Sequence, residues 1–184
     1  MKKFLIAGFS LLVGTVVLHA QDAPNMPGPE KEHDWLKQLV GEWEMESEMI
    51  SGPGQPGQKT KGTESVRAIG GLWVIAEIKG DTPMGVPVAA VLTLGFDPKK
   101  KKYVGTWIDS HLNHLWLYEG TIDPTGRILT LETEGPDMKD MTKQARYRDA
   151  IEIKSKDHKV LTSSILGDDG KWLTFNTTNY RRKS

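Results

Sequence analysis

The sequence predicts an all-β fold: an antiparallel up-and-down barrel of about ten strands, preceded by one short N-terminal helix. Three observations support this prediction. About ten short segments have strand character, apolar residues alternate with polar ones in several of them, and turn-forming residues separate nearly all of them. A meander of this kind has two exposed sheet edges, and closure into a barrel removes both.

The composition is that of a globular protein without cysteine. The 184 residues include 24 Lys and Arg and 24 Asp and Glu, so the formal net charge is zero. This length suits one domain with a single buried core. The lack of cysteine excludes disulfide bonds, thiol catalysis, cysteine-ligated zinc and a lipoprotein anchor. The zero charge disfavours nucleic acid as a partner, because nucleic-acid binding favours a basic surface.

Residues 1–20 have the pattern of a signal peptide. Two lysines precede an uncharged apolar run from Phe4 to Leu18, which at about 15 residues is short for a membrane span. Ala20 predicts cleavage before Gln21, and an uncleaved N-terminal anchor is the alternative. Residues 21–28, with two prolines and a glycine, are predicted to be a disordered leader. We therefore expect an exported protein, periplasmic or extracellular, with no membrane contact after signal removal.

A short helix is predicted at the start of the folded domain, which is expected to span residues 29–184 as one unit. Pro29 suits the first helical position, and the acidic residues that follow it interact favourably with the helix dipole. Gly41 is expected to cap the helix in a left-handed conformation. One face of the helix is apolar and consists of Trp35, Leu36, Leu39 and Val40.

Ten strands are predicted after the helix. The first, Glu42 to Ile50, alternates four glutamates with larger residues, so one face is expected to be solvated and the other to face the interior. The remaining predicted strands are Lys61–Ile69, Leu72–Lys79, Pro87–Phe96, Lys102–Asp109, His114–Ile122, Arg127–Glu134, Met141–Ile153, His158–Leu166 and Trp172–Arg182. The turn sequences between them are Gly70-Gly71, Asp97-Pro98, Asp123-Pro124-Thr125-Gly126, Gly135-Pro136-Asp137 and Gly167-Asp168-Asp169-Gly170.

Two short motifs resemble the calycin pattern of lipocalins and their relatives. Gly41-Glu42-Trp43 begins the first strand just after the helix, and Arg181-Arg182 ends the last. The resemblance implies that the indole closes one end of the barrel and that a late arginine stacks on it. The arrangement also has a physical basis, since a guanidinium over an indole makes a cation–π contact and caps free carbonyls.

A larger set of motifs is similar to an uncharacterised family catalogued as domain of unknown function 1579, over roughly Glu30 to Lys183. The resemblance implies a barrel and a frequently exported setting, but no activity, substrate or catalytic residue. The motifs are His33-Asp34-Trp35-Leu36, Leu39-Val40-Gly41-Glu42-Trp43, Gly70-Gly71-Leu72-Trp73-Val74, Leu94-Gly95-Phe96-Asp97-Pro98, the run from Tyr103 to Ser110, Tyr147-Arg148-Asp149 and Asp169-Gly170-Lys171-Trp172.

The leading functional hypothesis is non-enzymatic binding or carriage of a small amphipathic or anionic ligand in the barrel lumen, because small barrels tend to enclose one ligand cavity. Trp107 and Trp116 would supply stacking surface, with arginine as the counter-charge. The polar contacts would be Asp109, Arg146, Arg148 and Asn176. Alternation along a strand does not say which face is inside, so an exterior position for these polar faces stays open.

Two alternatives stay open. Asp109, His111 and His114 would form an enzyme or metal site at the barrel mouth if the chain turned between the histidines, although strand spacing fits metal ligation poorly. A barrel filled by tryptophans would instead be a structural or interaction module. A lone histidine in such a barrel also resembles nitrobindin, a haem-binding calycin relative, but no other haem signature is present. We therefore predict no cofactor and no catalytic residue.

Overall fold

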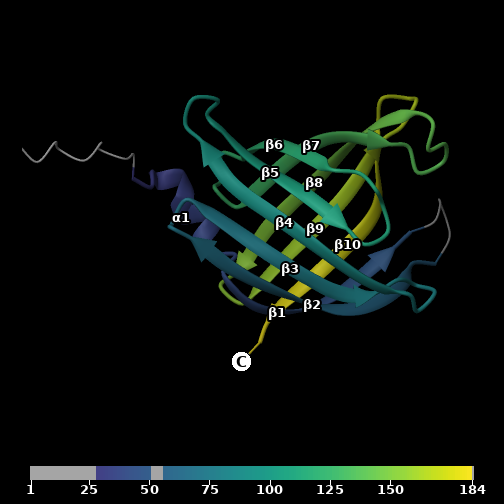
Figure 1. Ribbon diagram of the computed structural model, residues 1–184, viewed down its shortest axis with the longest axis horizontal. Coiled ribbons are helices and arrows are strands. Elements are labelled where there is room, and N and C mark those ends of the chain that lie inside the picture. The colour runs from purple at the N-terminus through teal and green to yellow at the C-terminus, as the bar shows by residue number, and fades with distance from the viewer. Residues whose placement is uncertain (1–27, 51–55, 184) are drawn as a thin grey trace, which may run out of the picture.

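The computed structural model describes residues 28–50 and 56–183, so the predicted signal peptide and all but one residue of the predicted leader lie outside the described residues. The described chain is a closed barrel of ten antiparallel strands with a short helix at one end (Figure 1). Its elements are α1 (Lys31–Lys37), β1 (Gly41–Met49), β2 (Gln58–Ile69), β3 (Trp73–Asp81), β4 (Pro87–Asp97), β5 (Lys102–Asp109), β6 (Trp116–Ile122), β7 (Ile128–Pro136), β8 (Gln144–Ser155), β9 (His158–Leu166) and β10 (Trp172–Arg182).

Each strand pairs with its neighbours in sequence, and β1 pairs with β10 to close the barrel. The predicted all-β, up-and-down architecture is therefore confirmed. The four glutamates of β1 lie on its more exposed side, while Trp43 is buried inside, as the alternation predicts. Among the described residues, the model contains no helix with the length and apolar character needed to cross a membrane.

Several predicted element ends are wrong by one to three residues, among them the start of β2 at Gln58 and of β6 at Trp116, and those of the helix and of β8 have a clear physical reason. The helix starts after Glu30 rather than at Pro29, because the Glu30 N–H donates to the Nδ1 atom of His33 at 2.8 Å, and it ends at Lys37, before Gly41. Strand β8 starts at Gln144 rather than Met141. The residues before Gln144 form a turn instead, closed by hydrogen bonds from the Asp137 N–H to the Lys143 carbonyl and from the Lys143 N–H to the Asp140 carbonyl.

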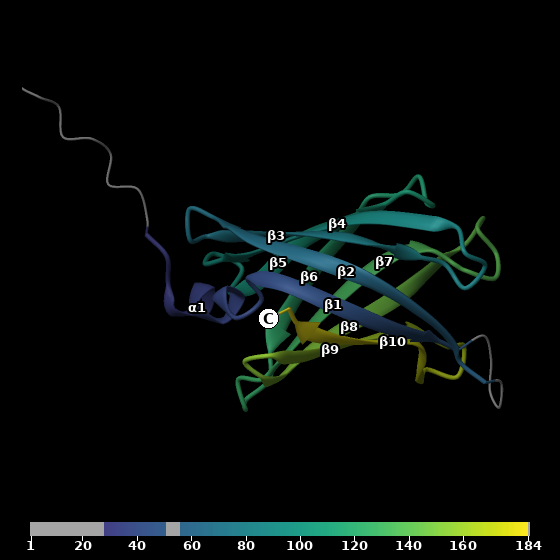
Figure 2. The ribbon, with the colours of Figure 1, turned by 90° about the horizontal axis from the view of Figure 1, so that it is seen from below.

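The C-terminal end of the chain lies at the end of the barrel next to α1 (Figure 2). Trp43, near the start of β1, and Arg182, the last residue of β10, contact each other there. The Arg182 guanidinium lies 4.1 Å from the centre of the Trp43 ring and donates to the carbonyls of Val40 at 2.7 Å and Gln38 at 3.2 Å. Gly41 has a φ of +135°, and a β-carbon there would collide with the Arg182 guanidinium. The indole and guanidinium plug predicted at this end is therefore present.

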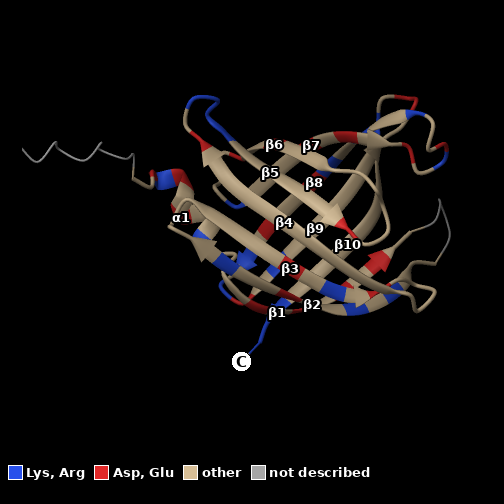
Figure 3. Cartoon of the chain, viewed as in Figure 1, with Lys and Arg blue, Asp and Glu red and all other residues tan. Residues whose placement is uncertain are grey.

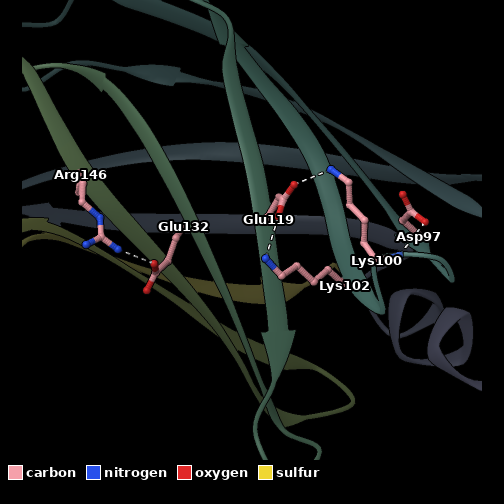
Figure 4. Close-up of polar contacts among 6 residues, drawn as sticks. All are labelled: Asp97, Lys100, Lys102, Glu119, Glu132 and Arg146. Carbon is pink, nitrogen blue, oxygen red and sulfur yellow. Dashed lines mark hydrogen bonds and ion pairs between the residues drawn. The ribbon is translucent and has the colours of Figure 1, made fainter.

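The outer face of the barrel carries exposed ion pairs (Figure 4). Glu119 on β6 pairs with Lys100 at 2.6 Å and with Lys102 at 2.8 Å, which lowers the pKa of Glu119 to about 2. Lysines of the run from Lys99 to Lys102 gather at the tip of the β4–β5 hairpin, as Figure 3 shows. This hairpin is a solvated loop.

Strands β6 and β7 separate toward the end opposite α1. They pair only from Glu119 to Ile122 on β6. The first three residues of β6, Trp116 to Tyr118, have no backbone partner in β7. The Trp116 ring packs against Gly135 on β7, so closely that a β-carbon at that glycine would overlap it. A side-chain contact therefore joins the two strands beyond the end of their backbone pairing.

Candidate functional site

The lumen contains a cavity of about 340 Å³. Turn residues Thr82 and Pro83 and the β7–β8 loop residue Met138 lie at its rim, so the cavity reaches the end of the barrel opposite the Trp43 plug. The volume falls at the lower end of the ~300–1,000 Å³ typical of ligand pockets. The barrel is therefore closed at one end and hollow at the other.

Aromatic side chains form much of the cavity wall. Tyr147 connects two of them, with its ring centre 5.0 Å from that of Trp116 and 6.2 Å from that of Phe175, both in edge-to-face geometry. Such pairs hold the rings in place. The full set of aromatic lining residues is Trp107, Trp116, Tyr118, Tyr147, Phe175 and Tyr180.

A carboxylate lies inside this largely apolar chamber. The Tyr118 hydroxyl donates to the Oδ2 atom of Asp149 at 2.6 Å, and the Ser163 hydroxyl adjoins the same group. Burial raises the pKa of Asp149, and the hydroxyls of Ser163 and Tyr118 oppose that rise. Burial, with the Asp149 charge as a second cause, raises the pKa of Tyr118 well above its usual range. Tyr118 is therefore a neutral donor at physiological pH.

Below the chamber, a buried ion pair joins β2 and β9. Lys159 donates to the carboxylate of Glu64, and the side chains of both residues are almost completely buried. The Lys159 ammonium also lies 4.6 Å from the ring centres of Trp43 and Tyr180. Burial lowers the pKa of Lys159, and the Glu64 charge opposes this effect. The pair forms part of a small cavity of about 40 Å³ whose wall also includes Asp149, so it is the floor of the lumen.

Four of the six predicted ligand-binding residues line the cavity: Trp107, Asp109, Trp116 and Asn176. Trp107 and Asp109 are brought together, since the Trp107 indole N–H donates to Asp109 at 3.1 Å. Asn176 donates to the Thr178 hydroxyl at 3.2 Å.

Strict alternation along β10 would place Trp172 and Asn176 on one face, but the structure separates them. The register of β10 shifts between Thr174 and Asn176, and both Phe175 and Asn176 line the cavity as a result. Such a bulge reverses the alternation on one side of it. Trp172 instead lies against Arg148, outside the lumen.

The other two predicted contacts, Arg146 and Arg148, do not line the cavity. Both bind Glu132 on the neighbouring strand β7, at 3.0 and 2.6 Å, and Arg148 stacks on Trp172 at 4.0 Å. The two arginines alternate with Tyr147 and Asp149, which occupy the inner face of β8. The sequence-based assignment of arginine as an internal counter-charge is wrong because the opposite face of β8 is inside.

The metal or enzyme site predicted at Asp109, His111 and His114 is not assembled in the described residues, where no three His, Asp or Glu side chains come close enough to hold a metal ion. Asp109 caps the turn by accepting the backbone N–H of His111 at 2.7 Å. His111 is exposed and contacts the Pro87 carbonyl. His114 packs edge-on against Trp116 at 4.8 Å. These three side chains stabilise the mouth loop.

Four polar groups of the lumen were not predicted from the sequence as site residues: Asp149, Tyr118, Glu64 and Lys159. Asp149 was named only as part of a motif of the similar family. Its neighbour Arg148, which points out of the lumen, was predicted to contact the ligand instead. Strand alternation could have indicated the position of Asp149, because Tyr147 and Asp149 lie on the same face of their strand. If Tyr147 is assumed to point into the core, Asp149 must point into the lumen as well. Nothing in the local sequence of Glu64 or Lys159 distinguishes them from solvated residues.

Comparison with known proteins identifies a family and a fold. The family model described as "Protein of unknown function (DUF1579)" matches residues 28–182. Rv2717c from M. tuberculosis has a similar structure, with a TM-score of 0.61, 12% identity and coverage of 84% of this chain and 99% of that one. The S-type phycobiliprotein lyase CPES from Guillardia theta gives a TM-score of 0.58 at 12% identity, covering 83% and 93%. At this identity the likeness concerns the fold alone. No curated protein matches the chain.

Proposed function

The chain belongs to the DUF1579 family of proteins of unknown function, and we propose that it binds a small, largely apolar ligand in the lumen of its barrel without catalysing a reaction. One observation carries this proposal, the cavity of about 340 Å³ between the Trp43 plug and the loops at the other end. A concave, mostly apolar chamber with a few convergent polar groups is the usual form of a small-molecule site.

The chamber favours an amphipathic ligand whose apolar body is buried. Apolar surface removed from water contributes about 25 cal/mol per Å² to binding, before the cost of association is subtracted. The polar side chains near the floor and wall, Asp149, Ser163 and Asn176, would fix the orientation of such a ligand. The anionic ligand considered from the sequence loses its support, because Arg146 and Arg148 bind Glu132 on the outer face.

The filled-barrel alternative is disfavoured by the same cavity, since Trp107 and Trp116 line the open space without filling it. Catalysis is disfavoured by the residues that line the chamber. The chamber wall contains two serines, Ser47 and Ser163, but no histidine or lysine among the lining residues that the structure describes. A serine nucleophile would therefore lack the neighbouring base that usually activates it.

We also propose that the protein acts outside the cytoplasm. This part of the proposal rests on the signal-peptide pattern of residues 1–20. The ligand would then be a molecule of the periplasm or the extracellular medium.

A matched pair of substitutions on β4 tests lumen binding. Ala90 lines the cavity, whereas its neighbour Ala89 is exposed on the other side of the strand. Ala90→Phe should fill part of the chamber and weaken binding of an uncharged aromatic probe, phenethyl alcohol, at least about tenfold, equal to about 1.4 kcal/mol. Ala89→Phe should leave binding unchanged. Binding is measured by NMR titration of the folded protein.

Native mass spectrometry of the protein purified from its own compartment provides the second measurement. A reproducible extra mass that is lost on denaturation would identify the natural ligand. If phenethyl alcohol bound the Ala90→Phe variant as well as the wild type, or if neither it nor probes of similar shape and different charge bound the wild type, lumen binding would be wrong.

A further inference from the structure

The charges on the lumen wall are all of one sign. Among the described residues that line the main cavity are three carboxylates and no lysine, arginine or histidine. The carboxylates are Asp81, Asp109 and Asp149. The nearest internal cation, Lys159, is already paired with Glu64 in the floor. The chamber therefore has an acidic interior that its own described side chains do not neutralise.

Asp149 is the carboxylate that most needs a partner. Its contacts are neutral hydroxyls, from Tyr118 at 2.6 Å and from the adjoining Ser163. It takes part in no ion pair among the described residues. A carboxylate has about four acceptor positions, so room for further donors is left on Asp149. Burying an ionised carboxylate is costly unless a cation accompanies it.

The aromatic walls of the chamber also fit a positively charged organic ligand. Six aromatic side chains surround the space, and the face of an aromatic ring attracts a cation through its quadrupole. An uncharged or anionic ligand lacks this attraction, so the walls and the Asp149 carboxylate favour the same charge on the ligand.

We propose that the ligand is a small organic amine, bound as its ammonium ion, with the charge on Asp149 and the hydrocarbon part against the aromatic walls. This inference rests on the proposed lumen binding and adds the chemical class of the ligand. An ammonium ion can donate hydrogen bonds to the Asp149 carboxylate. It is also attracted to the faces of the aromatic rings, whereas a neutral or anionic ligand of the same shape is not.

Three probes of closely similar shape and different charge test the inference on the full-length mature protein. They are phenethylamine, phenethyl alcohol and hydrocinnamate, which are cationic, neutral and anionic at neutral pH. We expect phenethylamine to bind at least about tenfold more tightly than phenethyl alcohol, since a hydrogen bond to a charged group contributes about 1.5–3 kcal/mol. Hydrocinnamate should bind most weakly.

Asp149→Asn should remove the preference for phenethylamine and leave the affinity for phenethyl alcohol within about twofold, which also shows that the variant is folded. Asp168→Asn, in the exposed β9–β10 turn, is the matched control and should retain the preference. Equal binding of amine and alcohol by the wild type, tightest binding of hydrocinnamate, or an amine preference that survives in Asp149→Asn would each overturn the assignment while lumen binding stands. Failure of all three probes to bind would count against lumen binding itself.

Discussion

Asp149 is a half-buried carboxylate on the cavity wall, and its surroundings bear on the stability of the protein. Its neighbours from three other strands are Tyr118, Ser163 and Tyr180, all neutral in the acid range because burial raises the pKa of both tyrosines well above 10.0. No cation offsets the charge on Asp149 among the described ion pairs. The pKa of Asp149 is therefore raised above 3.8, and the empty protein has to hold an unfavourable charge at neutral pH.

This environment predicts the direction of a pH effect. An acid whose pKa is higher in the folded state binds more protons folded than unfolded, so stability falls as pH rises from 3.8 through the raised pKa. Asp149→Asn should remove this loss of stability. The gain in the free energy of unfolding at neutral pH should be about 1.4 kcal/mol for each unit by which the pKa of Asp149 in the folded protein exceeds its pKa in the unfolded chain.

Urea unfolding across this pH range checks the prediction. The Asn variant should match the wild type below about pH 3 and be the more stable of the two at neutral pH. Asp168→Asn, an exposed carboxylate substitution, should show no such crossover. A variant less stable than the wild type at neutral pH would contradict the prediction.

At the scale of elements, β6 and β7 share the shortest backbone pairing in the barrel wall. It stops after Glu119 and Glu132, and beyond that point the Trp116 ring packs against Gly135. Trp116 is only 7% exposed and also lines the cavity. One residue therefore both connects the two strands and shapes the cavity, and the space it needs is provided by Gly135.

Gly135→Ala should displace the Trp116 ring, because the new methyl group would occupy the position of the ring atoms. We expect a loss of about 1–3 kcal/mol in the free energy of unfolding, typical of overpacking, and a changed tryptophan fluorescence spectrum. Gly28→Ala is the control, since nothing lies within 4 Å of a β-carbon built there. Unchanged stability and fluorescence in Gly135→Ala would show that the ring does not hold this position.

At the scale of the whole molecule, export remains a prediction from residues 1–20. The intact mass of the protein from its source should correspond to a chain that begins at Gln21. Leu12→Arg, which places a charge in the apolar run, should block processing and retain the full-length chain in the cytoplasm, whereas Leu12→Ile should be processed normally. A processed Leu12→Arg variant, or an unprocessed wild type, would contradict the assignment.

The sequence alone determined the fold class, the number of strands, nearly all of the turns and the plug at the closed end. The first three of these features depend on local information, because alternation marks several of the strands and Gly70-Gly71 and similar sequences mark the turns. The plug was expected from the resemblance to the calycin pattern, whose two motifs meet when the barrel closes. The helix start at Lys31 and the start of β8 at Gln144 were missed because side-chain capping and a hydrogen-bonded turn decided them.

Only the tertiary structure decided which side chains face the lumen. Alternation with a period of two residues does not say which face of a strand is inside. A shift of one residue in strand pairing moves every side chain to the opposite face. On β8 the choice placed Asp149 inside and Arg148 outside, and on β10 the bulge after Thr174 brought Asn176 inside. Long-range packing therefore set the charge of the cavity wall: it supplies the partners of Lys159 and, among the described residues, leaves Asp149 without a cation.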